Sequence, residues 1–262
     1  MPVVSIDELK NAVVSGRIGA ITIDTSIVER YQYGFESGVL AKMSQFSRVD
    51  TQHLVLDIVL HEMRAHLISQ ADLVHVQVRN ALKPLGNAWG VEKDKRTEAL
   101  QVLFGYQSSA DRTEERLQEF LDTSSSVLLE CADFVELPEV LSRYMTKRAP
   151  FGNKEAKKHE FPDAIALLAL EGWAENNNTR VVAVSGDSDW KRFCADSDRV
   201  YFVDDLGQAL SAFQTGADDA VALFELLLKT GKLGALDAAL LYSIYSQSDK
   251  ISVDFEGTTS WY

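Results

Sequence analysis

Cysteine is scarce in this sequence. Cys131 and Cys194 are the two cysteines among 262 residues, and neither belongs to a Cys-x-x-Cys pair. Their wide separation argues against a disulfide framework and against a zinc knuckle. We expect two reduced thiols packed in the core.

Long hydrophobic runs are also missing. The longest apolar stretches include residues 164–170 and 238–242, well short of the roughly 20 residues that a membrane-spanning helix needs. The first eight residues, Met-Pro-Val-Val-Ser-Ile-Asp-Glu, contain neither the basic segment nor the apolar segment of a secretory signal. We therefore expect a cytoplasmic protein that does not associate with membranes.

Positive charge is in short supply. The sequence has 26 Lys and Arg residues against 39 Asp and Glu residues, which gives a net charge of −13. A protein that holds nucleic acid by broad electrostatic contact should be basic instead. A function on nucleic acid would therefore need a local basic patch, or metal ions, to offset the charge of the protein.

The first part of the sequence alternates between β-type and helical patterns. We expect a buried strand over residues 18–23 and a helix from Ser26 toward Phe46. A second apolar strand over residues 52–56 leads into a helix, for which Asp57 is the expected N-cap.

The second part repeats this alternation. It contains a loop over residues 143–158, a helix over 160–173, strands over 179–185 and 200–203, and a helix over 206–213. Strands that alternate with helices predict an α/β fold with a central parallel, doubly wound sheet flanked by helices.

Two further regions are predicted to be helical. We interpret residues 71–145 as a helical insertion within a domain that covers residues 1–215. Residues 216–262 form a C-terminal helical extension, or the start of a further region, with helices expected near 218–229 and 235–245.

Carboxylates follow several of these predicted elements. Asp24 ends the first strand, Glu62 lies about one turn into a helix, and Asp163 lies in the first turn of another. Asp187 and Asp189 lie in the turn after a later strand. Functional groups gather at the carboxyl ends of parallel strands. Crowded carboxylates repel one another unless a cation is present, and Mg²⁺ and Mn²⁺ prefer such oxygen ligands.

Each carboxylate also has a purely structural interpretation. Asp24 could cap the next helix, Glu62 could face solvent, and Asp163 suits any helix N-terminus. Asp187 and Asp189 could be turn formers. The joint placement of these residues, at two strand ends and in two helix starts, favours a single metal site.

Four motifs resemble those of the PIN-domain (PilT N-terminus-like) nucleases. They are Ile-Thr-Ile-Asp24-Thr-Ser, Val-Leu-His-Glu62-Met, Phe-Pro-Asp163-Ala-Ile-Ala-Leu-Leu-Ala and Val-Ser185-Gly-Asp187-Ser-Asp189-Trp. The resemblance covers about residues 18–66 and 160–205. It implies a three-layer fold and a Mg²⁺- or Mn²⁺-dependent endonuclease, usually acting on RNA, that leaves 5′-phosphate and 3′-hydroxyl ends.

The resemblance also implies roles for individual residues. The catalytic and metal-binding carboxylates would be Asp24, Glu62, Asp163 and Asp187, with Asp189 as a further ligand or a supporting group. Thr25 and Ser185 would hydrogen-bond a carboxylate or a phosphate. Around a hundred residues separate Glu62 from Asp163, far more than in compact toxin-type PIN domains, which indicates a larger branch of the family with a helical insertion.

A basic segment precedes Asp163. Its residues are Arg143, Lys147, Arg148, Lys154, Lys157 and Lys158, against the single acid Glu155. This segment could be a solvated loop, or it could steer a phosphate backbone toward the carboxylates. On the second interpretation the substrate-binding residues are Arg148, Lys154, Lys157, Lys158 and His159.

Several alternatives remain open at this stage. A haloacid-dehalogenase-like phosphatase also begins with an Asp after a first strand, but it needs a second Asp where this sequence has Ser26. A PIN-like scaffold or nucleic-acid-binding module without catalysis is the other. His61 and His66 are spaced one residue too far apart for a zinc-peptidase helix.

Expected partners follow from the nuclease interpretation. Nucleic acid is the first of them, with RNA favoured over DNA. A toxin or defence role would add a regulatory or antitoxin protein, and a homo-oligomer is also compatible with the sequence.

Overall fold

A five-stranded parallel sheet organises the chain. The computed structural model describes residues 4–151 and 160–214. The strands are β1 (Ile18–Ile23), β2 (Gln52–Leu56), β3 (Val127–Leu129), β4 (Arg180–Val184) and β5 (Val200–Val203). Their order across the sheet is β3-β2-β1-β4-β5, and every neighbouring pair is parallel. The predicted α/β class is confirmed.

The central strand β1 is buried on both faces. Its residue Ile21 pairs with His53 of β2 on one side and with Val182 of β4 on the other. All three side chains are fully buried. Continuous burial of this kind requires helices on both faces of a parallel sheet, and the near-continuous apolar sequence of these strands reflects that requirement.

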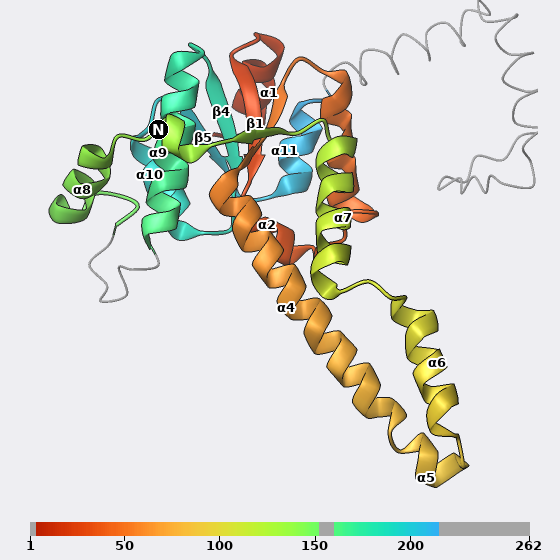
Figure 1. The fold of residues 1–262 in the computed structure, drawn as a ribbon. Helices are drawn as coiled ribbons and strands as arrows, with labels where there is room; N and C mark the ends of the chain where they lie inside the picture. The colour runs from red at the N-terminus through yellow and green to blue at the C-terminus, as the bar shows by residue number, and fades with distance from the viewer. Residues whose placement is uncertain (1–3, 152–159, 215–262) are drawn as a thin grey trace, which may run out of the picture. The chain divides into compact units, whose positions relative to one another are not determined.

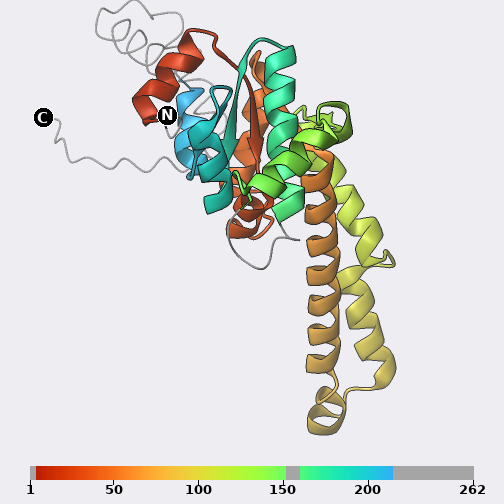
Figure 2. The ribbon, with the colours of Figure 1, turned by 90° about the vertical axis from the view of Figure 1, so that its left-hand side faces the viewer.

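Helices cover both faces of the sheet and complete three layers. Helix α9 (Glu160–Asn176) packs on one face against β4 and β5, while α1 (Ile6–Val14) and α11 (Leu206–Ala212) lie together on the other (Figures 1 and 2). Helix α10 (Ser188–Asp196) joins β4 to β5 and packs against α9. The sequence analysis did not identify α1, whose start is fixed by reciprocal hydrogen bonds between Ser5 and Glu8.

The prediction of one helix from Ser26 toward Phe46 is wrong. Helix α2 (Thr25–Arg30) ends early, and a turn leads to α3 (Gly38–Ala41) and the 3-10 helix η1 (Lys42–Arg48). Gln32 and Tyr33 both have positive φ angles, which a continuous helix cannot accommodate. The turn buries the side chains of Tyr33 and Phe35, and this burial outweighs the helical pattern of the local sequence.

A long helical hairpin extends away from the sheet (Figure 1). Its first arm is α4 (Asp57–Leu82), and α5 (Leu85–Trp89) and α6 (Lys93–Phe104) complete it. The buried residues of α4 all lie between Val59 and Leu67, and neither α5 nor α6 has a buried residue. The outer part of the hairpin therefore contributes nothing to the core.

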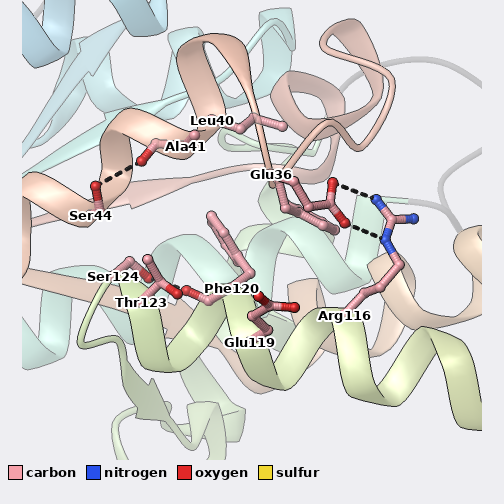
Figure 3. Close-up of a pocket in the computed structure, with 10 residues that line it drawn as sticks. Glu36, Leu40, Ala41, Ser44, Arg116, Glu119, Phe120, Thr123 and Ser124 are labelled. Atoms are coloured by element: carbon pink, nitrogen blue, oxygen red, sulfur yellow. Dashed lines mark hydrogen bonds and ion pairs between the residues drawn. The ribbon is translucent and has the colours of Figure 1, made fainter. Parts of the chain in front are cut away.

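Only part of residues 71–145 projects in this way. Helix α7 (Ser109–Thr123) returns to the core, where the rings of Phe120 and Phe35 lie 4.6 Å apart. Figure 3 shows Phe120 and Arg116 of α7 facing the segment of Glu36, with a bidentate ion pair between Arg116 and Glu36. The strand β3 then joins the sheet, and the 3-10 helix η2 (Cys131–Asp133) and α8 (Leu137–Thr146) follow it.

Asp57 links the start of α4 to the segment after β3. It was expected to be the N-cap, but the cap is Leu56 and Asp57 is the first helical residue. Its Oδ1 accepts hydrogen bonds from the backbone of Ile58 at 2.8 Å and of Cys131 at 3.3 Å. The carboxylate therefore joins two neighbouring strand ends instead of capping one helix.

A close contact between α9 and η2 gives a test of this packing. A Cβ atom at Gly172 would lie 2.6 Å from the carbonyl oxygen of Phe134. We expect Gly172→Ala to lower the free energy of unfolding by about 1–3 kcal/mol, because the backbone must shift, even though alanine favours helix. Urea denaturation would measure the change, with Glu175→Ala on the exposed side of α9 as the control. Equal stability of both variants would contradict the packing.

Other expectations have mixed outcomes. Cys131 and Cys194 are buried free thiols, as predicted. The loop predicted from Arg143 is wrong at its start, because α8 continues to Thr146. Among the described residues, no helix combines the length and apolar character that crossing a membrane demands. The helices expected near 218–229 and 235–245 lie outside the described residues.

Candidate active site

Asp24 occupies the carboxyl end of the central strand. It directly follows β1, and its side chain is only 6% exposed. Its Oδ2 accepts hydrogen bonds from the hydroxyls of Ser26 at 2.5 Å and Ser185 at 2.8 Å. Burial raises the pKa of Asp24, and the two hydroxyl hydrogen bonds oppose that rise. The structure therefore holds a carboxylate at a position where its charge is costly.

Glu62 follows the neighbouring strand β2. It lies in the second turn of α4, which begins directly after β2. The hydroxyl of Thr25 donates a hydrogen bond to its Oε2 at 2.9 Å, so the residue after Asp24 orients the second carboxylate. An open depression of about 570 Å³ adjoins this side chain, lined also by His61, Arg64 and Pro162 among others.

Asp163 interacts electrostatically with the other three carboxylates. It lies in the first turn of α9, and its Oδ1 accepts a hydrogen bond of 2.8 Å from the indole Nε1 of Trp190. Burial is the main cause that raises the pKa of Asp163 to about 7, and the negative charges of Asp24, Asp187 and Glu62 raise it further. This effect means that the four carboxylates lie close enough to interact.

Asp187 is the N-cap of α10. Its Oδ1 accepts a hydrogen bond from the backbone of Asp189 at 2.6 Å. The backbone N–H of Asp187 donates to the Ser185 hydroxyl at 2.9 Å, and that hydroxyl donates in turn to Asp24. Ser185 therefore positions two of the four carboxylates relative to each other.

The remaining predicted ligand, Asp189, has an ion-pair partner in this structure. Its Oδ1 forms an ion pair with Arg192 at 2.7 Å, within one turn of α10. Arg192 also donates to the backbone carbonyl of Pro150 at 2.9 Å. Arg192 thus links Asp189, at the start of α10, to the backbone of Pro150.

The spacing of the four carboxylates bears on whether they hold a metal ion. In the described part of the chain, no group of three or more Asp, Glu, His or Cys side chains converges closely enough to hold an ion as it stands. The donor chemistry nevertheless suits a hard divalent cation. Burial and, after it, the charges of Asp24, Asp187 and Glu62 raise the pKa of Asp163, and a bound cation would relieve this repulsion.

The predicted basic segment is only partly described. Arg148 forms an ion pair with Glu139 at 3.0 Å, and Arg143 pairs with Glu139 at 2.8 Å and with Glu171 at 3.7 Å. Acidic neighbours thus offset both arginines. The other expected substrate-binding residues lie outside the described residues; they are Lys154, Lys157, Lys158 and His159.

A second cavity of about 220 Å³ lies between η1 and α7, where Figure 3 shows its lining. Its lining includes Leu40, Phe120 and the ion-paired Glu36 and Arg116. None of the four carboxylates lines it. We therefore place the candidate active site at the carboxyl ends of β2, β1 and β4.

Comparison with protein families decides the assignment. A PIN-domain family model matches residues 21–190, which cover most of the described sheet and all four carboxylates. The chain belongs to the PIN-domain family. No curated protein and no solved structure matches the chain. PIN domains are generally nucleases that act on nucleic acids and typically use divalent metals, so the family supports a hydrolase role in coarse terms.

The sequence analysis did not identify two residues of this PIN domain that position the carboxylates. The Ser26 hydroxyl donates to Asp24 and accepts from the backbone N–H of Gly186 at 2.9 Å, so it joins the ends of β1 and β4. Trp190 holds Asp163 through its indole nitrogen. The available signals in the sequence were a hydroxyl two residues after Asp24 and an aromatic residue after the Asp187 turn.

The link through Ser185 leads to a prediction for the PIN domain. We expect Ser185→Ala to weaken Mn²⁺ binding by about 10–100-fold, because both Asp24 and the Asp187 turn lose a partner. Isothermal titration would measure the affinity. Ser188→Ala, an exposed serine in the same turn, is the control and should change it by less than about threefold. Equal Mn²⁺ affinities for the two variants would show that Ser185 does not support metal binding.

Proposed function

We propose that this PIN domain is a divalent-metal-dependent endonuclease that hydrolyses phosphodiester bonds, with RNA as the expected substrate. One observation carries the proposal: at the carboxyl end of the sheet, burial and, after it, the charges of three neighbouring carboxylates raise the pKa of Asp163. Strongly perturbed carboxylates in one cluster mark functional sites more often than structural ones. Membership of a nuclease family gives the cluster its chemistry.

Asp24, Glu62, Asp163 and Asp187 are the proposed holders of Mg²⁺ or Mn²⁺. The ion, when bound, would supply positive charge that polarises a phosphodiester and lowers the pKa of a water molecule. Thr25, Ser26, Ser185 and Trp190 keep the carboxylates oriented through the hydrogen bonds described above. Asp189 remains a supporting residue, since Arg192 already neutralises its charge.

The reaction is hydrolysis. A water oxygen would form a bond to phosphorus while the bond from phosphorus to the 3′ oxygen breaks, and the 3′ oxygen would take up a proton. The products are a 5′-phosphate and a 3′-hydroxyl. Because no 2′-hydroxyl takes part, this chemistry suits DNA as well as RNA, and the preference for RNA rests on family habit.

The setting of the reaction belongs to the same proposal. It includes cytoplasmic location, a toxin or defence role, a regulatory or antitoxin partner and a homo-oligomer. Phosphate steering by Lys154, Lys157, Lys158 and His159 is also part of it. Reversal of Lys157 and Lys158 to Glu would weaken substrate binding, and unchanged affinity across a salt series would count against their role.

A non-catalytic scaffold is the second candidate. It is favoured by the lack, in the described residues, of three side chains that already converge on one point. The phosphatase alternative has less support, because Ser26, which stands where the second Asp is needed, is hydrogen-bonded to Asp24. Mn²⁺ binding separates a nuclease from a scaffold, and hydrolysis of a chromogenic phosphomonoester that is lost in Asp24→Asn would indicate a phosphatase.

The proposal is tested with labelled single-stranded RNA and a DNA of the same sequence. Each would be incubated with the protein in Mn²⁺, Mg²⁺ or EDTA, and the ends of the products identified. Metal-dependent cleavage to 5′-phosphate ends supports the nuclease and shows which polymer it prefers. Folded protein that neither cleaves the RNA or DNA nor binds Mn²⁺ would favour the non-catalytic scaffold.

A further inference from the structure

The outer end of the helical hairpin contains a cationic notch. It is a depression of about 290 Å³ between the last turns of α4 and the first turns of α6. Four of its lining residues are Arg79, Lys83, Lys93 and Arg96, and none of the others is acidic. The remaining lining residues are Leu82, Thr97 and Leu100. We refer to this depression as the hairpin notch.

The cations of the hairpin notch have no ion-pair partner among the described residues. Within residues 4–151 and 160–214, no carboxylate lies within ion-pair distance of any of its four cations. Elsewhere on the same hairpin and on α7 the pattern is different, since Arg64, Arg112 and Arg116 each pair with a glutamate. Like charges that gather without partners repel one another, and the repulsion is greatest when no anion is bound.

One of the four cations is fixed in place. Arg96 donates a hydrogen bond of 2.9 Å to the backbone carbonyl of Lys83, and its guanidinium lies against Gly86 of α5. Its Nε is buried and has no partner in the described structure. Arg79, Lys83 and Lys93 are exposed around it. The notch thus combines one hydrogen-bonded cation with three exposed cations.

The fold itself does not need these residues. No residue of α5 or α6 is buried, so the hairpin end can serve a ligand without cost to the core. Trp89 ends α5 and is 81% exposed. Exposed aromatic rings and cations on one surface are typical of proteins that bind single-stranded nucleic acid, where bases stack on the rings and cations hold the phosphates.

We infer that the hairpin notch binds the phosphate backbone of a single-stranded nucleic acid at a distance from the cleavage site. This inference rests on the proposed nuclease function. Glu62 and Arg79 lie on the same straight helix, so the two sites are separated by about 25 Å at 1.5 Å per residue. A stacked strand rises about 3.4 Å per nucleotide, so roughly seven or eight nucleotides bridge that distance. The notch therefore selects substrates of sufficient length.

The experiment compares binding of fluorescent RNA oligonucleotides of 5 and 20 nucleotides in EDTA. The notch variant is Arg79→Gln/Lys83→Gln/Lys93→Gln, which retains Arg96 because that residue supports the hairpin. The control, Lys10→Gln/Lys42→Gln/Arg48→Gln, removes the same charge elsewhere. We expect the notch variant to bind the 20-mer about tenfold or more weakly at ~0.1 M salt, with a slope of log K against log salt that is smaller by about 2. Its binding of the 5-mer should match that of the control.

Several results would overturn the inference. Equal weakening by the notch variant and the control would show only a general charge effect. Equal loss for the 5-mer and the 20-mer would place the contact at the cleavage site. Binding of polyglutamate that disappears in the notch variant, while RNA binding stays unchanged, would assign the notch to an acidic protein.

The inference and the nuclease proposal fail separately. If the wild type cleaves RNA and the notch variant binds the 20-mer as the control does, the notch inference is wrong and the nuclease stands. If the wild type binds the 20-mer through the notch but neither cleaves RNA nor binds Mn²⁺, the nuclease proposal is wrong and the notch stands. Circular dichroism of both triple variants confirms that the hairpin is still helical.

Discussion

Asp24→Asn should reduce phosphodiester cleavage by at least about 100-fold without lowering the stability of the metal-free protein. The Asn side-chain oxygen can still accept the hydrogen bonds from Ser26 and Ser185. The substitution also removes a buried carboxylate whose pKa burial has raised. The metal-free variant should therefore unfold at the same temperature as the wild type or at a higher one.

The combination of these two results is the informative part. A residue retained only to cap α2 or to fill the core would lose stability together with activity. Asp189→Asn is the matched control, because Asp189 lies in the Asp187 turn but is paired with Arg192. It should change cleavage by less than about tenfold. Full activity in Asp24→Asn, or a loss that follows unfolding, would contradict the assignment.

The second large effect concerns pH. In the metal-free protein the pKa of Asp163 is raised from 3.8 to about 7, so the folded state keeps a proton that the unfolded state releases. The contribution of Asp163 to stability is therefore complete below about pH 4 and decreases as the pH rises toward 7. Its slope approaches about 1.4 kcal/mol per pH unit within that window.

Asp163→Asn isolates this contribution. His53 acts in the opposite direction, because burial lowers its pKa to about 3 and its stabilising effect grows as the pH rises toward 6.5. The contribution of His53 is the same in the variant and the wild type, so it cancels in the difference between their unfolding free energies. Urea titrations between pH 4.5 and 7.5 should show that the unfolding free energy of Asp163→Asn rises relative to that of the wild type. The rise should be a few kcal/mol in total over this range. A difference that does not depend on pH would show that the pKa of Asp163 is not raised.

Metal should reverse this trend. Divalent ions bind the deprotonated carboxylates, so Mn²⁺ should stabilise the wild type increasingly as the pH rises toward 7 and above. Asp163→Asn should respond much less to Mn²⁺. Stabilisation that is equal at pH 5 and pH 8 would argue against binding at these carboxylates.

The sequence predicted the central elements of the sheet well. β1, β2, β4 and β5 all have apolar runs bounded by polar or glycine residues, and each was located to within a residue or two. The carboxylates followed from this, because a residue just after a parallel strand must lie at the carboxyl edge of the sheet. Asp24 and Asp187 were therefore predictable from strand ends alone.

Other features depended on tertiary contacts. The strand β3 has three residues, and Val127 and Leu128 are partly exposed. So short a run was indistinguishable from its helical surroundings, and only pairing with β2 makes it a strand. The turn at Tyr33 was equally hidden, since its positive φ is stabilised by burial of the ring and not by glycine.

Details of the candidate active site also depended on tertiary contacts that the sequence does not reveal. Spacing in the sequence could bring Asp189 to the carboxylates as easily as Asp187, because both lie in one turn. In the structure they differ in their partners, because Asp189 pairs with Arg192 three residues later. The hydroxyl of Ser26 likewise gains its role from contact with Gly186, which lies 160 residues away in the sequence.

The most direct test of the central claim is to locate the ion. Crystals of the protein soaked in Mn²⁺ would be measured near the manganese absorption edge, where anomalous scattering identifies the metal. We predict an anomalous peak in contact with Asp24 and at least two of Glu62, Asp163 and Asp187, and no such peak in Asp24→Asn crystals. A peak confined to other acidic residues, or none at a concentration that supports cleavage, would contradict the account.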